Sequence, residues 1–472
     1  MPASYRTPLF FGLLLLLAFA FQGSRPLTEP DEGRYVDIAL QMVDSGDWWV
    51  PRVHAEEPHL AKPPLTYWLI AASVTAFGRT EWAVRFPHAL ALLLTALLVR
   101  DVARSLGLPS PRVAAAVWAS SLGALVGASI VSTDAILVTF ETAAMAAALR
   151  NRTTLMWIAF GLAFLTKGPP ALLPLAALLV FLRGRGLRLF ADPAGIACFL
   201  ALGLGWFASM VARDGALASY FLGYELIDRV VTGVHGRNPE WWGPLEVYAP
   251  ALALGVLPWV VPAAWAPRPA LSPSARRFLW TWILVPLAVF VLSRSRLPLY
   301  VLPLFVPASL LISPRVAALW DRYPRRIAIA GAAWVVLVLA LRGFGAGPPE
   351  PIDAKALAAR ARKIETGMSA PMDEIVFVQS KPVYGLRFYT GLPIETARSA
   401  DAADPSPEPD RKTPTVCEEA RESEHPLWLV PPGHAARFEE EVRACGLAPR
   451  RLVGDLGPLR PYEVLPQVTA KN

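Results

Sequence analysis

Lysine is almost absent from the first 349 residues of the chain, which contain only Lys62 and Lys167. Arginine supplies nearly all other basic side chains there, and a pair of prolines follows each lysine, directly after Lys62 and after Gly168 in the case of Lys167. A compact ammonium is not interchangeable with a guanidinium, so this restricted use indicates selected positions. Snorkelling of a lysine stem at a helix end is the alternative explanation.

Three acidic residues are candidates to act with these lysines. Asp31 and Glu32 open a segment with helical periodicity, and Asp134 begins an apolar segment. Each of these acids alone is typical of a helix N-terminus. Transfer of a sugar from a phosphate carrier needs a carboxylate to take the acceptor's proton and cations to stabilise the departing phosphate. We therefore expect Asp31, Glu32 and Asp134 to be catalytic, and the two lysines to bind phosphate.

Two further stretches add cations and hydroxyl groups. The first contains His235 and Arg237, followed by two tryptophans typical of a membrane interface. The second, residues 293–300, has two arginines and ends at Tyr300, whose hydroxyl could donate a hydrogen bond. We expect Arg237 and Tyr300 to bind an anionic ligand, whereas His235 could bind a phosphate or a metal.

The elements that carry these residues are predicted to be membrane spans. The chain has 472 residues, of which 54% are hydrophobic and 18% charged, and the apolar residues come in blocks. A span needs roughly 20 mostly apolar residues. About eleven blocks are candidates, and the first lacks a good cleavage site for a signal peptide. They lie near residues 8–22, 84–99, 113–130, 135–149, 153–166, 170–182, 194–212, 245–265, 278–293, 298–313 and 327–343.

Every second connection between these blocks is rich in arginine, which predicts the orientation. Basic residues favour cytoplasmic loops, so the N-terminus is expected in the cytoplasm and the C-terminus outside. The net charge of +7 is then a signal of topology and not of nucleic-acid binding. The two long loops 23–83 and 213–244, and the tail, fall on the outer side, where we expect the site.

The predicted domains are a membrane domain, residues 1–345, and a small soluble α/β domain, residues 346–472. Within the first outer loop, helical spacing predicts an amphipathic helix along the bilayer. In the tail we expect two buried strands, a helix and a flexible loop. These segments are residues 31–45 for the amphipathic helix, 375–378 and 427–430 for the strands, 435–445 for the helix and 400–412 for the loop.

The chain has three cysteines, Cys198, Cys417 and Cys445. Cys198 falls in an apolar block, where we expect it to pack as a small hydrophobe. Cys417 and Cys445 both lie in the outer tail, where an oxidising compartment permits a disulfide. Their distance is not encoded in the sequence, so pairing and free thiols both stay open.

Four ordered motifs resemble one enzyme family over about residues 20–315. The family is that of the 4-amino-4-deoxy-L-arabinose lipid A transferases, which share the type C glycosyltransferase fold with the protein O-mannosyltransferases. The motifs are Asp31-Glu32-Gly33-Arg34-Tyr35, Lys62-Pro63-Pro64-Leu65, Leu165-Thr166-Lys167-Gly168 and Leu297-Pro298-Leu299-Tyr300.

The resemblance implies transfer of a sugar from undecaprenyl phosphate, with inversion at the anomeric carbon, in a bacterial inner membrane. By position, Asp31 matches an essential acid and Asp134 a second functional acid. Arg34, Lys62 and Tyr300 match groups that hold the carrier phosphate.

One departure concerns metal binding. His235 matches a histidine near the phosphate and a divalent cation. The family's glutamate before Lys-Pro-Pro, a metal ligand, is replaced here by Ala61, two residues after His59. A divalent cation would thus rely on His235 and His59, and the sugar and the acceptor stay open.

We interpret the chain as a glycosyltransferase with a lipid acceptor such as lipid A. A protein hydroxyl as acceptor, as in O-mannosylation, is one alternative. A flippase or transporter for the lipid-linked sugar is another, although transporters place charges near the bilayer midplane and often repeat their halves. A non-catalytic scaffold is the third, supported by Ala61.

Overall fold

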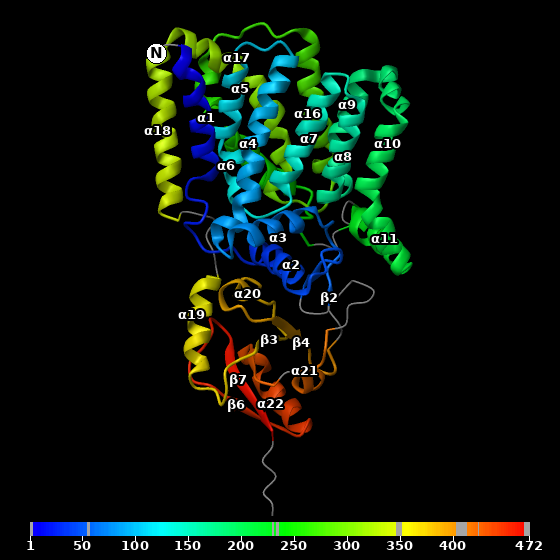
Figure 1. Cartoon of the computed structure of the whole chain (residues 1–472), viewed down its shortest axis with the longest axis vertical. Helices are drawn as coiled ribbons and strands as arrows, with labels where there is room; N and C mark the ends of the chain where they lie inside the picture. Colours follow the sequence, from blue (N-terminus) through cyan, green and yellow to red (C-terminus); the bar gives the residue numbers. More distant parts are fainter. Residues whose placement is uncertain are drawn as a thin grey trace, which may run out of the picture. The chain divides into compact units, whose positions relative to one another are not determined.

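The computed structural model describes residues 3–53, 57–228, 231–232, 236–345, 352–402, 413–422 and 424–466. The chain divides into two compact units (Figure 1). The membrane unit comprises Met1–Ser24, Ala61–Leu69 and Trp82–Ala346. The α/β unit comprises Arg25–Leu60, Ile70–Glu81 and Gly347–Asn472. Most of the first outer loop thus joins the tail, whereas the predicted boundary assigned it to the membrane domain.

Helices make up the membrane unit, where they run roughly parallel or antiparallel to one another (Figure 1). Each predicted apolar block contains one or more of them. In chain order they are α1 (Ala3–Phe19), α4 (Glu81–Ser105), α5 (Pro111–Ser120), α6 (Leu122–Ser129), α7 (Asp134–Leu149), α8 (Thr153–Lys167), η1 (Pro169–Leu172), α9 (Leu173–Leu182), η2 (Arg183–Ala191), α10 (Pro193–Phe199), η3 (Leu200–Leu204), α11 (Gly205–Arg213), α12 (Ala216–Ser219), η4 (Tyr220–Asp228), α14 (Gly243–Gly255), α15 (Val260–Trp265), α16 (Pro273–Leu292), η5 (Pro298–Leu304), α17 (Phe305–Arg322) and α18 (Pro324–Gly343).

Length and composition make this a polytopic α-helical membrane protein. Among the described residues, six helices are long and apolar enough to cross a bilayer, or seven if the bent pair α5 and α6 forms one span. The pair bends by 56° at Ser121. Other blocks contain short or interrupted helices, such as α14 and α15, so a count of about eleven spans stays a prediction.

A five-stranded mixed sheet forms the centre of the α/β unit, as predicted for the tail. Its strand order is β4-β3-β5-β7-β6; β3 pairs in parallel with β4 and β5, and β7 pairs antiparallel with β5 and β6. The strands are β3 (Glu374–Val378), β4 (Ile394–Ala397), β5 (Pro426–Val430), β6 (Leu447–Arg451) and β7 (Arg460–Pro466). Both predicted strands are confirmed.

Alternation along β3 and β5 buries both faces of this sheet. Ile375 and Phe377 face a core that includes α19 (Ala354–Glu365), whereas Val376 and Trp428 face α22 (Ala435–Ala444). Successive side chains of a strand point to opposite faces, so a continuous apolar run requires cover on both. Helices α20 (Gly385–Thr390) and α21 (Val416–Glu422) and the one-turn η6 (Pro432–His434) complete the tail. The predicted loop 400–412 lies largely outside the described residues.

The first outer loop contributes α2, spanning Asp31–Ser45 as predicted, and the short antiparallel pair β1 (Arg52–Val53) and β2 (Glu57–Pro58). Asp31 and Glu32 occupy the first turn of α2, where the helix dipole favours negative charge. Gly46 ends the helix at a φ of 73°, which glycine adopts without steric cost. A short apolar helix that was not predicted, α3 (Leu65–Phe77), lies inside the predicted loop 23–83.

Cys417 on α21 and Cys445 after α22 form a disulfide, with 5.8 Å between their Cα atoms. Their sequence separation is 28 residues. The sequence had left the pairing open, and the packing of α21 against α22 brings the two cysteines together.

The double variant Cys417→Ala/Cys445→Ala is expected to lower the stability of the α/β unit by about 2–4 kcal/mol, because the unfolded chain regains loop entropy. Thermal unfolding of the purified chain in detergent measures the loss. Cys198→Ala, which removes the free cysteine, serves as the control. Equal melting temperatures for the double variant and the parent would contradict the prediction.

Candidate active site

Asp134 and Lys167 form an ion pair at the ends of two neighbouring helices. Asp134 is the first residue of α7 and Lys167 the last residue of α8, and these helices pack against each other. Lys167 Nζ donates a hydrogen bond to Asp134 Oδ1, and both side chains are at least 90% buried. Ser132 Oγ donates to the other carboxylate oxygen at 3.3 Å. The structure thus joins two residues that the sequence selected separately.

Tyr300 and Arg237 extend this pair. Lys167 Nζ lies 4.4 Å from the centroid of the Tyr300 ring, which is a cation–π contact. Arg237 Nη1 donates to Tyr300 Oη at 3.2 Å. We call Asp134, Lys167, Tyr300 and Arg237 the Lys167 cluster. Its members come from α7, α8, η5 and residues 236–242, so tertiary packing assembles four of the predicted site residues.

Arg296 holds the backbone of the segment that carries Arg237. Arg296 is 4% exposed, and its Nη1 donates to the carbonyl oxygens of Asn238 at 2.7 Å and Glu240 at 2.8 Å. Its amide donates to the carbonyl of Arg237 at 2.9 Å. The sequence suggested an anionic ligand for the arginines of residues 293–300. For Arg296, the described hydrogen bonds instead indicate a role in positioning Arg237.

Lys62, also in the membrane unit, pairs with a residue that the sequence analysis did not select. Its Nζ lies 3.7 Å from Glu225 Oε2 and donates to the carbonyl of Ala61 at 2.7 Å. Glu225 lies on η4, a π-helix, and its Oε1 is 3.5 Å from the hydroxyl of Tyr220. π-Helical turns often occur at functional sites. The sequence feature that could have identified Glu225 as a site residue is its position in the second outer loop.

Asp31 and Glu32 are adjacent in sequence but differ in environment. The Asp31 side chain is 57% exposed and pairs with Arg34 Nη2 at 2.7 Å. Glu32 is completely buried, and its two oxygens accept from the Arg25 guanidinium at 2.8 and 2.9 Å. Neighbouring residues of a helix point about 100° apart, which explains the difference. This placement favours a structural role for Glu32 and leaves Asp31 available for chemistry.

The two histidines considered for metal binding give no metal site in the described chain. His59 follows β2, and its amide donates to the carbonyl of Pro51 at 2.8 Å. His235 lies outside the described residues. No group of three His, Cys, Asp or Glu side chains among the described residues could hold a metal ion. Because His235 lies outside the described residues, a divalent cation stays a prediction, and we derive no catalytic step through one.

Glu141 is a further acid that the sequence analysis missed. It lies two turns after Asp134 on α7, is 2% exposed, and its Oε2 accepts no hydrogen bond within the described structure. Ionisable residues inside membrane segments are costly and usually functional. An acid in the middle of the apolar block 135–149 was the signal that could have revealed it.

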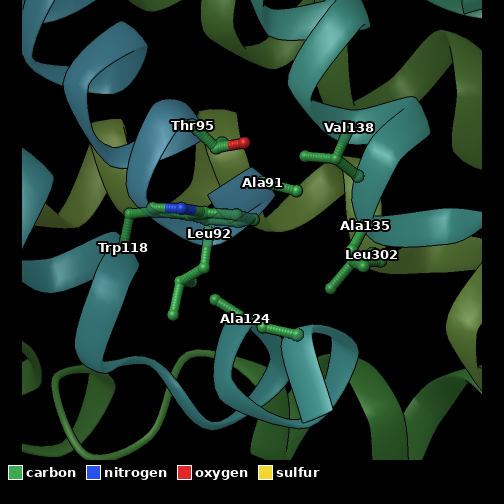
Figure 2. A pocket seen from close by; sticks show the side chains of 9 residues that line it. Ala91, Leu92, Thr95, Trp118, Ala124, Ala135, Val138 and Leu302 are labelled. Atoms are coloured by element: carbon green, nitrogen blue, oxygen red, sulfur yellow. The ribbon is translucent and has the colours of Figure 1, made fainter. Parts of the chain in front are cut away.

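A small pocket lies between α4, α5, α6, α7 and η5 (Figure 2). Ala135, next to Asp134, and Leu302, two residues after Tyr300, both line it. Figure 2 shows the side chains of Leu92, Trp118 and Val138 around the same space. Among the residues that line the pocket, Thr95 has the one side-chain oxygen, and the others are aliphatic side chains and the Trp118 indole. The pocket therefore does not suit a phosphate group.

The fold and the charged clusters define a class: a polytopic membrane protein with charged side chains gathered at the ends of apolar helices. Residues 61–212 match the family model for dolichyl-phosphate-mannose-protein mannosyltransferases. The chain is similar to the undecaprenyl phosphate-alpha-4-amino-4-deoxy-L-arabinose arabinosyl transferase of Yersinia enterocolitica, with 33% identity over 329 residues, 65% of this chain and 57% of the relative. The corresponding Edwardsiella ictaluri protein is 31% identical over 346 residues, covering 68% and 61%.

Solved structures agree on the fold. The crystal structure of ArnT from Cupriavidus metallidurans bound to undecaprenyl phosphate matches with a TM-score of 0.75 at 22% identity, over 98% of both chains. The crystal structure of the same protein in the apo state matches with a TM-score of 0.74 at 21% identity, over 98% of both chains. The family resemblance expected from the motifs is confirmed, and the chain is a relative of the aminoarabinose transferases. The sequence matches span less than two thirds of the curated relatives' length.

Glu32→Gln is expected to destabilise the α/β unit by about 3 kcal/mol, because it breaks a buried ion pair and leaves Arg25 uncompensated. Asp31→Asn should change stability by less than about 0.5 kcal/mol, since the exposed pair with Arg34 contributes little. Thermal unfolding of both variants in detergent measures the difference. Equal shifts in melting temperature would contradict the assigned roles.

Proposed function

We propose that the protein is an inverting glycosyltransferase that moves a sugar from undecaprenyl phosphate, or a similar polyprenyl phosphate, to an envelope acceptor such as lipid A. The observation that carries the proposal is the Lys167 cluster, which gathers two cations and a hydroxyl at the ends of apolar helices. A phosphate on a hydrocarbon chain is an anion that such a site suits, because low dielectric strengthens its attraction to Lys167 and Arg237. The names of the relatives from Yersinia enterocolitica and Edwardsiella ictaluri support this donor.

In the proposed reaction, an acceptor oxygen attacks the anomeric carbon from the face opposite the phosphate. The bond between this carbon and the phosphate oxygen breaks, and the polyprenyl phosphate leaves with the electron pair. Asp31 orients the acceptor or takes its proton. Lys62, Arg34, Lys167, Arg237 and the Tyr300 hydroxyl stabilise the charge that develops on the leaving phosphate. Asp134 holds the Lys167 ammonium in place.

The proposed location is the bacterial inner membrane, with about eleven spans, a cytoplasmic N-terminus and a periplasmic C-terminal domain. The alternation of arginine-rich connections supports this orientation. The donor's chain would then lie between apolar helices.

The match to the mannosyltransferase family model favours a second candidate, with a protein hydroxyl as acceptor. Two observations favour the lipid acceptor. The family model matches residues 61–212, whereas the curated aminoarabinose transferases align over 329 and 346 residues. The motif around Asp31 also lies outside the segment that the model matches.

Deleting the gene should abolish one envelope glycan, which mass spectrometry of lipid A, other glycolipids and periplasmic glycoproteins would identify. When the deletion strain is complemented with Asp31→Asn or Lys62→Ala, the amount of this glycan is expected to be at least about 100-fold lower than with the parent gene. The reason is that the proton acceptor or a phosphate-binding cation is lost. Lys381→Ala, which changes an exposed lysine of the α/β unit, is the matched control and should restore the glycan.

If the glycan that disappears is on a peptide, the acceptor is a protein hydroxyl and not a lipid. Normal glycans together with a polyprenyl-linked sugar outside the membrane would favour a scaffold. Failure of that lipid-linked sugar to appear outside would favour a flippase. Full restoration by both site variants would overturn the proposed function.

A further inference from the structure

Arg387 on α20 bridges two aspartates of α2 within the α/β unit. Its Nε lies 3.6 Å from Asp37 Oδ1, and its Nη2 donates to Asp44 Oδ2 at 2.8 Å. Asp37 and Asp44 are seven residues apart, which is two helical turns, so they share one face of α2. The side chains of Arg387 and Asp37 are 7% and 1% exposed. A single guanidinium from the tail therefore holds α2 along two turns.

Asp37 depends on this guanidinium for charge compensation. Neither of its carboxylate oxygens accepts a hydrogen bond in the described part of the chain. Burial raises the pKa of Asp37 from 3.8 to about 7, Arg387 acts to lower this pKa, and the Asp44 carboxylate acts to raise it. Arg79 adds a further cation, with its Nη2 3.7 Å from Asp44 Oδ2. Beside Arg387, Asp37 therefore titrates near neutral pH, and without this guanidinium its pKa would be higher still.

A second contact joins the start of α2 to the start of α20. Glu29, two residues before Asp31, accepts a hydrogen bond at its Oε1 from the amide of Gly385 at 2.7 Å. A Cβ at either Gly33 or Gly385 would overlap this carboxylate oxygen, so glycine at both positions leaves room for the Glu29 side chain in its observed place. The amide of Leu27 also donates to Tyr389 Oη at 2.9 Å.

From these contacts we propose that α20 fixes the position of α2, and that Arg387 is a positioning residue for Asp31. The proposal rests on the proposed role of Asp31 in transfer. Asp31 and Asp37 are six residues apart on one helix, about 9 Å along its axis, so a shift of α2 at Asp37 displaces Asp31 as well. A misplacement of about 1 Å can cost about 100-fold in rate. The C-terminal domain would thus set the catalytic geometry without contacting substrate.

The test compares Arg387→Met with Arg450→Met in the full-length protein. Arg450 pairs with the buried Glu463 in the same sheet-containing unit, so its loss removes a similar ion pair without touching α2. Transfer is measured with undecaprenyl phosphate-linked 4-amino-4-deoxy-L-arabinose as donor and lipid A as acceptor. We expect Arg387→Met to lower kcat at least about 10-fold with the donor KM within about 2-fold, and Arg450→Met to leave kcat near that of the parent.

The pH profile separates positioning from general destabilisation. In the parent, the pKa of Asp37 is about 7, so its carboxyl group is mostly ionised and paired with Arg387 at pH 8 and mostly neutral at pH 6. Without Arg387 this pKa rises further, and the ion pair that the parent has at pH 8 is lost. The defect of Arg387→Met should therefore be larger at pH 8 than at pH 6. Adding Asp37→Asn should restore at least half of kcat at pH 8 and remove this pH dependence. If Arg387→Met does not accumulate, Arg387→Lys is measured instead, with a smaller loss expected.

The outcomes distinguish the two proposals. If Asp31→Asn retains full transfer, the proposed function fails. If Asp31→Asn is inactive while Arg387→Met behaves like Arg450→Met, the proposed function stands and the positioning role is overturned. A parental kcat for Arg387→Lys, or no restoration by Asp37→Asn, would also overturn it.

Discussion

The interaction on which the site depends is the buried ion pair between Asp134 and Lys167. Either charge alone at the end of an apolar helix would carry a large desolvation cost, so each requires the other. The pair also places the ammonium against the Tyr300 ring, which links α7 and α8 to η5. Arg237 then reaches the Tyr300 hydroxyl. The Lys167 ammonium, neutralised by Asp134, thus contacts side chains that lie more than 160 residues apart in the sequence.

Predicted site residues lie on two kinds of element, helix ends in the membrane unit and the helix α2 in the α/β unit. In the membrane unit, Asp134 and Lys167 lie at helix ends, because the interiors of apolar helices tolerate few charges. In the α/β unit, the exposed Asp31 lies on a helix held by buried polar contacts from Glu29, Asp37 and Arg387. Buried polar contacts contribute little net stability, but they restrict the geometry of the groups that they join.

The family resemblance indicates the kind of donor, whereas the positions of the residues show which side chains lie close to Lys62. The motifs around Asp31, Lys62, Lys167 and Tyr300 resemble those of the aminoarabinose transferases. Ala61 departs from that pattern at a metal-ligand position, and Lys62 is instead close to Glu225. The acidic partner of this lysine therefore comes from the second outer loop, more than 160 residues later in the chain.

Apolar blocks, strand periodicity and charge alternation are local properties, and the sequence alone therefore predicted the helical membrane segments, α2, β3, β5 and α22. Residue type, position and motif order were enough to select Asp31, Lys62, Asp134, Lys167 and Tyr300 as candidates. Long-range contacts were not predictable, because no local pattern encodes which helix ends meet. Only the tertiary structure paired Lys167 with Asp134, buried Glu32 against Arg25 while exposing Asp31, and closed the disulfide between Cys417 and Cys445. It also joined the first outer loop to the C-terminal sheet domain, since the packing of α2 on α20 depends on close approach at Gly33 and Gly385.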